Sequence, residues 1–141
     1  MRNSGIELDI KVPNQTRYLS LIGRIGEDIA REVARYSGDR ETLAYQLNLV
    51  LTEAMANAIK YGKNDKKEEK VHIVINIGEN ALLIRIFDNG QGFNINEIPA
   101  PDFNMLEDCG RGIFLIKTLM DSVTYVKNKD GNVLEMVKQL G

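Results

Sequence analysis

The stretch Leu51-Thr-Glu-Ala-Met-Ala-Asn-Ala-Ile-Lys-Tyr-Gly62 combines an apolar helical stripe with a separate polar face. Glu53 and Asn57 are four residues apart, and Lys60 follows three residues later. A helix therefore brings these three side chains onto one face. Apolar residues recur at helical intervals on the opposite side, at Leu43, Leu47, Val50, Ala54 and Ala58. The pattern predicts a helix packed against a core on one side, with a polar face that is either simply solvated or functional.

Length and composition are typical of one soluble globular domain. The chain has 141 residues, of which 43% are hydrophobic and 27% are charged, and its net charge is −2. This charge lacks the excess of basic residues expected for nucleic-acid binding. No apolar run approaches membrane-spanning length, and the first residues do not resemble a signal peptide. We therefore expect a single domain over residues 1–141, without a nucleic-acid or membrane partner.

Cysteine content bears on the compartment. Cys109 is the one cysteine in the sequence, so an internal disulfide is excluded. A chain without disulfides suits a reducing environment, and we expect a cytoplasmic protein.

Hydrophobic periodicity predicts the order strand, two helices, hairpin, helix, hairpin. Alternation indicates a strand over residues 6–12, after which Asn14 is a candidate N-cap for a helix that runs to about Tyr36. Asp39 is the candidate N-cap of the helix described above, which Gly62 closes. The expected hairpins join residues 71–77 to 81–87 and residues 123–129 to 133–140. This order favours the α+β class, as a two-layer α/β sandwich with a mixed, mainly antiparallel sheet.

A second polar segment, Asp88-Asn-Gly-Gln-Gly-Phe93, follows the expected strand 81–87. A carboxylate accepts hydrogen bonds but cannot donate them, so a buried Asp88 can select a ligand that presents an amino group. Gly90 and Gly92 would let the backbone approach that ligand without an intervening Cβ atom. The alternative is an ordinary polar turn, since Asp and Gly are common turn residues.

A third segment, Gly110-Arg-Gly112, follows a stretch without clear periodicity over residues 94–109. The two glycines precede a short amphipathic helix expected from Ile113 to about Met120. Free backbone N–H groups and the positive end of the helix dipole can bind phosphate there, although a glycine hinge is the alternative. Neither glycine pair extends to G-x-G-x-x-G, and no G-K-[ST] occurs. A nucleotide site here would be neither a dinucleotide fold nor a P-loop.

The three segments in this order resemble the N, G1 and G2 boxes of the GHKL ATPase superfamily, which includes gyrase, histidine kinases and mismatch-repair ATPases. The matching patterns are Glu53-x-x-x-Asn57-Ala58, Asp88-x-Gly90-x-Gly92 and Gly110-x-Gly112. Two helices precede the first hairpin, and residues 110–121 read Gly-Arg-Gly-Ile-Phe-Leu-Ile-Lys-Thr-Leu-Met-Asp. These details are similar to the bacterial anti-sigma-factor serine/threonine-protein kinases of partner-switching systems. The resemblance spans roughly residues 6–140.

The resemblance implies a site for ATP and Mg²⁺. Asn57 would supply a side-chain oxygen to Mg²⁺, which takes few protein ligands and keeps several waters. Asp88 would accept a hydrogen bond from the adenine amino group, and Gly90 and Gly92 would belong to the same nucleotide-binding segment. Residues 94–109 would form the ATP lid.

The same resemblance assigns the phosphate contacts and the catalytic carboxylate. Gly110, Arg111 and Gly112 would bring main-chain amides to the phosphates, with Arg111 adding charge. Glu53 would orient or deprotonate the attacking hydroxyl group of a protein serine or threonine. Lys60 is either a phosphate contact or an ordinary surface lysine.

Two positions depart from the family pattern. Tyr61 stands where the family often has His. The last hairpin reads Gly131-Asn-Val-Leu134, where the family often has Gly-Thr or a similar hydroxyl near the adenine. The second departure leaves the contact of Asp88 with adenine less supported and predicts weaker nucleotide affinity. His72 alternates out of phase with its apolar neighbours, so we expect it to face solvent.

The function that the resemblance implies is an ATP-dependent serine/threonine-protein kinase that is also an anti-sigma factor. Its substrate would be an anti-sigma-factor antagonist, and a sigma factor would be a second partner. Members of the family commonly dimerise, so a homodimer is also expected. The alternative is an ATP-binding adaptor that sequesters a partner protein without phosphorylating it. A histidine kinase is disfavoured, because no helix carries a phosphoacceptor histidine.

Overall fold

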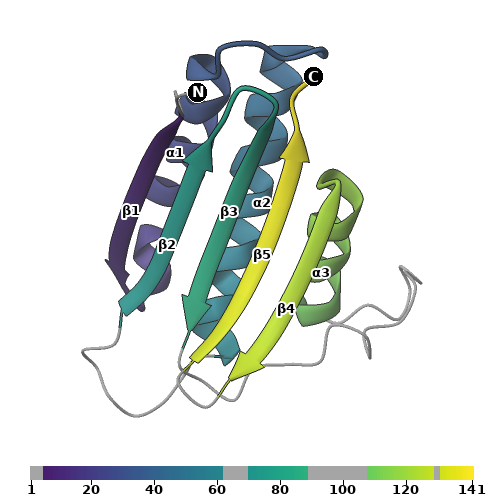
Figure 1. Ribbon diagram of the computed structural model, residues 1–141. Helices are drawn as coiled ribbons and strands as arrows, with labels where there is room; N and C mark the ends of the chain where they lie inside the picture. Colours follow the sequence, from purple (N-terminus) through teal and green to yellow (C-terminus); the bar gives the residue numbers. More distant parts are fainter. Residues whose placement is uncertain (1–4, 62–69, 89–107, 129–130) are drawn as a thin grey trace.

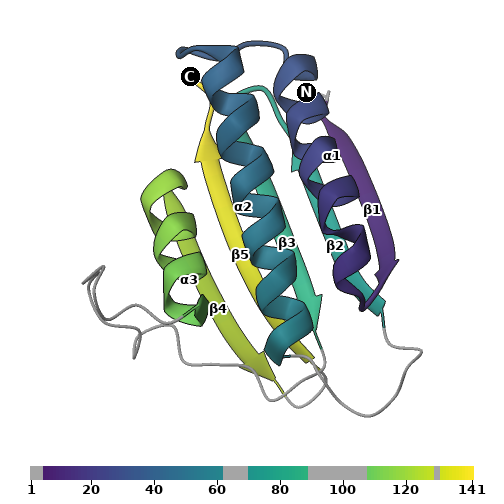
Figure 2. The same ribbon diagram turned by 180° about the vertical axis from the view of Figure 1, so that it is seen from behind.

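The computed structural model describes residues 5–61, 70–88, 108–128 and 131–141. Within these residues, five strands form one sheet and the helices lie on one of its faces (Figures 1 and 2). In chain order the elements are β1 (Ile6–Pro13), the 3₁₀-helix η1 (Thr16–Tyr18), α1 (Leu19–Glu32), α2 (Arg40–Tyr61), β2 (Lys70–Ile77), β3 (Ala81–Asp88), α3 (Asp108–Leu119), β4 (Ser122–Asn128) and β5 (Gly131–Gln139).

The sheet has the strand order β1-β2-β3-β5-β4, and all four of these pairings are antiparallel. The expected two-layer α+β sandwich is confirmed, and its mainly antiparallel sheet is antiparallel at each described pairing. Both hairpins form as expected, because β2 pairs with β3 and β4 pairs with β5. Gly131 has a φ of 144°, which places a glycine where the second hairpin turn requires one. None of the helices among the described residues is long and apolar enough to cross a membrane.

The start of the first helix differs from the expectation. Asn14 is not its N-cap: Gln15 precedes the 3₁₀ turn η1, Tyr18 precedes α1, and neither residue makes a side-chain capping bond. Oδ1 of Asn14 is instead buried without a hydrogen-bond partner among the described residues. A 3₁₀ turn at this point tightens the chain before the α-helix and removes the cap position that the sequence suggested.

The first helix also ends earlier than expected, at Glu32 instead of about Tyr36. Val33 adopts an extended conformation, with φ −61° and ψ 141°, which stops the helix. Nη1 of Arg40 donates hydrogen bonds to the carbonyl oxygens of residues 30, 31 and 33, at 3.2, 3.4 and 2.8 Å. A helix end leaves such carbonyls without intrahelical partners, so the guanidinium group of Arg40 stabilises the early termination.

The second helix begins where the sequence predicts and runs to Tyr61, while Gly62, its expected closing residue, lies outside the described residues. Asp39 caps its N-terminus, since Oδ2 accepts hydrogen bonds from the backbone N–H and the hydroxyl group of Thr42, at 3.0 and 2.8 Å. The side-chain and backbone bonds from Thr42 lower the pKa of Asp39 below its ordinary value. The predicted apolar stripe of α2 is buried throughout.

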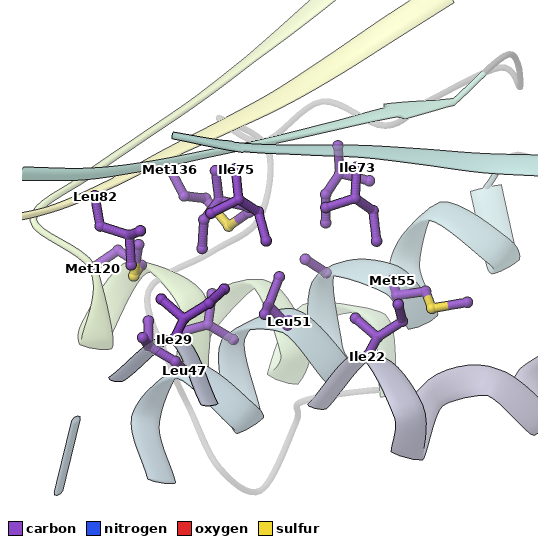
Figure 3. Close-up of a cluster of buried hydrophobic side chains, with 14 of the residues drawn as sticks. Ile22, Ile29, Leu47, Leu51, Met55, Ile73, Ile75, Leu82, Met120 and Met136 are labelled. Carbon is purple, nitrogen blue, oxygen red and sulfur yellow. The ribbon is translucent and has the colours of Figure 1, made fainter. Parts of the chain in front are cut away.

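The core fills the space between the helices and the sheet, as the close-up in Figure 3 shows. Side chains from α1 and α2 face those of the strands, among them Ile22, Ile29, Leu47, Leu51, Met55, Ile73, Ile75, Leu82 and Met136. Gly26 lets α1 approach α2 closely, because a Cβ atom there would lie 2.8 Å from the carbonyl oxygen of Leu47. The core thus holds α2 in a fixed position over the centre of the sheet.

The other face of the sheet carries the out-of-phase residues of the strands and no described helix (Figure 1). His72 lies on this face, as alternation predicts, and its side chain is 33% exposed. Its Nε2 atom is 2.6 Å from Oδ1 of Asp9, and its ring stacks on Phe87 at 5.1 Å between centroids.

Candidate functional site

Four elements meet at one end of the molecule, the lower end in Figure 1. The C-terminal turns of α2, the last residue of β3, the first turns of α3 and the first residues of β5 all lie there. Glu53 and Asn57 belong to α2, Asp88 ends β3, and Gly110 and Gly112 belong to α3, whereas residues 89–93 of the second segment lie outside the described residues. The fold therefore gathers the described residues of all three segments at the same end of the sandwich.

Glu53 and Asn57 lie on the face of α2 that meets the start of α3. A Cβ atom added to Gly112 would lie 2.9 Å from Oε2 of Glu53 and 3.4 Å from Nδ2 of Asn57. Distances this short show that the backbone of Gly112 packs directly against both side chains. A carboxylate, a carboxamide and the start of a helix thus come into contact, although the sequence separates α2 from α3 widely.

Asn57 is 5% exposed, and its Nδ2 atom has no hydrogen-bond partner among the described residues. A buried polar atom without a partner costs about 1–3 kcal/mol, so native proteins seldom retain one without a reason. A bound ligand at this position would provide the missing partner. Asn14 and Gln46 also carry such an atom among the described residues, but Asn57 is the one placed against Gly112, and this combination indicates a binding site.

The donor set fits Mg²⁺ held mainly by phosphate. The described residues contain no group of three or more His, Cys, Asp or Glu side chains that could hold a metal ion. Mg²⁺ commonly takes one or two protein ligands and completes its shell with phosphate oxygens and water. A single carboxamide from Asn57, with its oxygen turned toward the ion, is compatible with this coordination.

The third helix begins at Asp108, five residues before its expected start at Ile113. The N–H groups of the first three residues of an α-helix have no intrahelical acceptor, so within α3 the free donors belong to residues 108–110. The backbone amide of Gly110 is among these donors, whereas that of Arg111 is not. Gly112 lies in the second turn, where its lack of a side chain makes room for Glu53. The side chain of Arg111 lies outside the described part of the structure.

Asp88 is the last residue of β3 and is 8% exposed. Asn132 is paired with it across the strands and donates a hydrogen bond from Nδ2 to Oδ1 of Asp88 at 2.9 Å. The hydroxyl group of Tyr125, on β4, donates to Oδ2 of Asp88 at 3.4 Å. The sequence pattern indicated only a missing hydroxyl group at residue 132 and gave no indication of Tyr125. The register of the last hairpin was the signal that would have revealed both.

Some of the remaining expected site residues belong to the described part of the structure, and others do not. Lys60 lies in the last turn of α2 and is exposed. Gly90 and Gly92 lie outside the described residues, as do residues 94–107 of the expected lid. Asp108 and Cys109, its last two residues, form the first turn of α3.

A family model described as "Histidine kinase-like ATPase domain" matches residues 13–138. The chain belongs to this family. The match confirms the resemblance to the GHKL ATPases, because it spans the segments that carry Glu53, Asn57, Asp88 and Gly112. The described residues of the candidate site lie within the range that this histidine kinase-like ATPase domain model matches.

Curated relatives of this ATPase domain include proteins named "Serine-protein kinase RsbW". The relative from Bacillus subtilis is 26% identical, and the match covers 99% of this chain and 89% of the relative. The relative from Oceanobacillus iheyensis is 27% identical over 94% of this chain and 86% of its own length. The relative from Listeria innocua is 28% identical over 83% and 77%. Their names agree with the expected resemblance to bacterial serine kinases.

Solved structures support the fold of the domain. The crystal structure of the RsbU and RsbW domains of Rv1364c from Mycobacterium tuberculosis matches 96% of this chain with a TM-score of 0.67 and 11% identity. The histidine kinase domain of the blue-light activated kinase EL346 from Erythrobacter litoralis matches 91% with a TM-score of 0.55 and 15% identity. The domain spans 32% of the first chain and 61% of the second.

Proposed function

We propose that the chain is an ATP-dependent serine/threonine-protein kinase and anti-sigma factor of a bacterial partner-switching system. Its substrate is an anti-sigma-factor antagonist. The observation that carries the proposal is the contact of Gly112 with Glu53 and Asn57, which sets a carboxylate beside a buried amide and a helix N-terminus. The names of the relatives support serine as the acceptor residue.

Each described part of the site is assigned to one part of bound Mg·ATP. Asp88 accepts from the amino group of adenine, and it is buried at the end of β3 as that task requires. Asn57 would hold Mg²⁺ through its side-chain oxygen, and its unpartnered Nδ2 atom would then donate a hydrogen bond to a phosphate oxygen. The free amide of Gly110 at the start of α3 binds the phosphates, and Arg111 adds positive charge. The family resemblance also assigns Gly90 and Gly92, which lie outside the described residues, to nucleotide binding.

Glu53 acts on the protein substrate. As the serine or threonine oxygen forms its bond to the γ-phosphorus, the Glu53 carboxylate takes the hydroxyl proton and ADP leaves with the electrons of the broken phosphorus–oxygen bond. Mg²⁺ held by Asn57 would supply positive charge that neutralises the phosphates. The contact with Gly112 holds Glu53 next to the first turns of α3, where the phosphates bind. Positioning and electrostatics therefore account for most of the catalysis.

Partner choice follows from phosphorylation. The antagonist and a sigma factor compete for the kinase, so the unphosphorylated antagonist releases the sigma factor. A phosphate group on the antagonist adds about −1.5 to −2 units of charge, which disfavours an interface that formed without it. Phosphorylation of the antagonist then returns the kinase to the sigma factor.

The test is a transfer assay with Mg·ATP and the antagonist, read by the mass of the antagonist. Wild type is expected to add one phosphate group that is stable to acid and labile to base, as for phosphoserine or phosphothreonine. Glu53→Gln is expected to bind ATP but to transfer at least about 100-fold more slowly, because it lacks the base. Glu41→Gln is the matched control, since Glu41 is an exposed glutamate on the same helix.

Two outcomes would contradict the proposal. Transfer by Glu53→Gln at the wild-type rate would exclude Glu53 as the base. Capture of the antagonist by wild type without any phosphate transfer would identify an ATP-binding adaptor instead of a kinase.

A further inference from the structure

Three adjacent strands, β3, β5 and β4, bring polar side chains together at the end of the site to which the proposed function assigns adenine. We propose that Asn132, supported by Tyr125, is a positioning residue that orients the Asp88 carboxylate and makes the site select a purine with a 6-amino group. The inference rests on the proposed use of ATP. It gives a role to Asn132, which stands where the family pattern often has a hydroxyl group, and to Tyr125, which no sequence motif singled out.

The strand register explains why these residues meet. Asp88 is the direct cross-strand partner of Asn132, so their side chains project from the same face of the sheet. Tyr125 on β4 pairs with Leu134, two residues beyond Asn132, and its hydroxyl group reaches Asp88 at 3.4 Å. Asn132 is 3% exposed, which is rare for an asparagine unless its amide is hydrogen-bonded.

The chemistry of the pair allows one arrangement only. Asp88 as a carboxylate accepts and never donates, so the amide nitrogen of Asn132 must be the end that faces it. The terminal torsion angle of an aspartate side chain has a broad distribution, so a carboxylate without hydrogen-bond partners rotates over a wide range. Donors on both carboxylate oxygens, from two different strands, fix the plane of the Asp88 carboxylate.

A fixed carboxylate discriminates between purines. The remaining lone pairs of Asp88 accept a hydrogen from a 6-amino group, whereas a 6-oxo group would place one acceptor against another. Because Asn132 holds Asp88 before a ligand arrives, the ligand does not have to order it. This reverses the expectation from the sequence that the hairpin without a hydroxyl group leaves Asp88 poorly supported.

The test compares two nucleotides by calorimetric titration in the presence of Mg²⁺ without any protein substrate. One is ATP, and the other is purine riboside triphosphate, which lacks the 6-amino group. Asn132→Ala is expected to weaken ATP binding by roughly tenfold, the factor that 1.4 kcal/mol provides. Binding of purine riboside triphosphate should stay the same, so the preference for ATP collapses. Tyr125→Phe should reduce the preference by about twofold, because its bond is long.

Two further variants separate positioning from a structural role. Asn132→Thr keeps a hydroxyl donor and should recover most of the preference for ATP. Asn76→Ala is the matched control, since Asn76 is a half-buried asparagine of β2 on the opposite face of the sheet. It should leave both affinities unchanged.

The possible results are distinguishable. Equal weakening of both nucleotides by Asn132→Ala would overturn the inference, because a purely structural effect ignores the 6-amino group. An unchanged preference in Asn132→Ala would overturn it as well, while leaving the proposed kinase intact. If wild type binds neither nucleotide, the proposed function fails and the inference fails with it.

Discussion

At the scale of single residues, the effect of a helical glycine depends on the atom that its missing side chain would meet. A Cβ atom at Gly112 would lie 2.9 Å from Oε2 of Glu53, which is the far end of a flexible side chain. A Cβ atom at Gly26 would lie 2.8 Å from the carbonyl oxygen of Leu47, which is backbone inside a packed helix. The Glu53 carboxylate can rotate away and the Leu47 carbonyl cannot. We therefore expect Gly112 to matter for activity and Gly26 for stability.

Gly112→Ala should therefore separate activity from stability. We expect the displaced Glu53 carboxylate to slow phosphate transfer by at least about tenfold, since small misplacements of catalytic groups are costly. Stability should hold or rise by up to about 1 kcal/mol, because alanine is the better helix former. Transfer rates under saturating ATP and thermal unfolding measure the two effects. Unchanged transfer would show that Glu53 does not need the space that Gly112 leaves.

Gly26→Ala is the contrasting variant. Overpacking against the Leu47 carbonyl should destabilise the fold by about 1–3 kcal/mol and leave transfer per folded molecule unchanged.

At the scale of elements, two adjacent residues complete the ends of two helices. Asp39 accepts hydrogen bonds at the start of α2, and Arg40 donates to the last carbonyls of α1. Both helix ends leave backbone groups without intrahelical partners, and short connections leave few other groups to satisfy them. The turn between α1 and α2 is therefore defined by side chains on its C-terminal side.

The cap at Asp39 should make stability depend on pH. Its pKa is lowered in the folded protein by the bonds from Thr42. Its contribution is thus fully present above its ordinary value of 3.8 and is lost as the pH falls through the lower folded-state value. Asp39→Asn keeps a neutral cap at every pH. Urea unfolding should show wild type losing stability relative to Asp39→Asn below the ordinary value. Parallel pH profiles would contradict this role of the charge.

At the scale of the whole molecule, α2 connects the two halves of the proposed site. Its buried stripe packs on the sheet while Glu53 and Asn57 face α3. Asp88 reaches the same end from the centre of the sheet. Because Asn57 keeps an unpartnered atom among the described residues, the molecule without ligand carries a cost that a ligand can remove.

Mg·ATP should therefore stabilise the whole domain. At a free concentration 100 times Kd, binding to the folded state alone adds about 2.7 kcal/mol to the free energy of unfolding. The shift in unfolding temperature measures it, with ATP in chelator as the comparison. Asn57→Ala should lose the Mg²⁺-dependent part of the shift and keep the rest. An identical shift in wild type and Asn57→Ala would remove Asn57 from the metal site.

Local patterns predicted most of the elements, and the failures occurred where a distant group competes with them. Strand alternation and the cap at Asp39 depend on neighbours in the sequence, so they could be read directly. Asn14 resembled an N-cap, but the 3₁₀ turn before α1 displaced it. The end of α1 depends on Arg40, which periodicity does not reveal. The homodimer stays a prediction from the family resemblance.

Sequence alone was sufficient to identify the polar residues of α2, β3 and α3 as one family pattern, because their types and order are encoded along the chain. It could not show that Gly112 packs on Glu53, or that Asn132 holds Asp88. Both contacts join residues that are distant in the chain, and they depend on the strand register and on how closely α3 packs against α2. The polar face of α2 therefore becomes a functional face only when the sheet and α3 pack beside the helix.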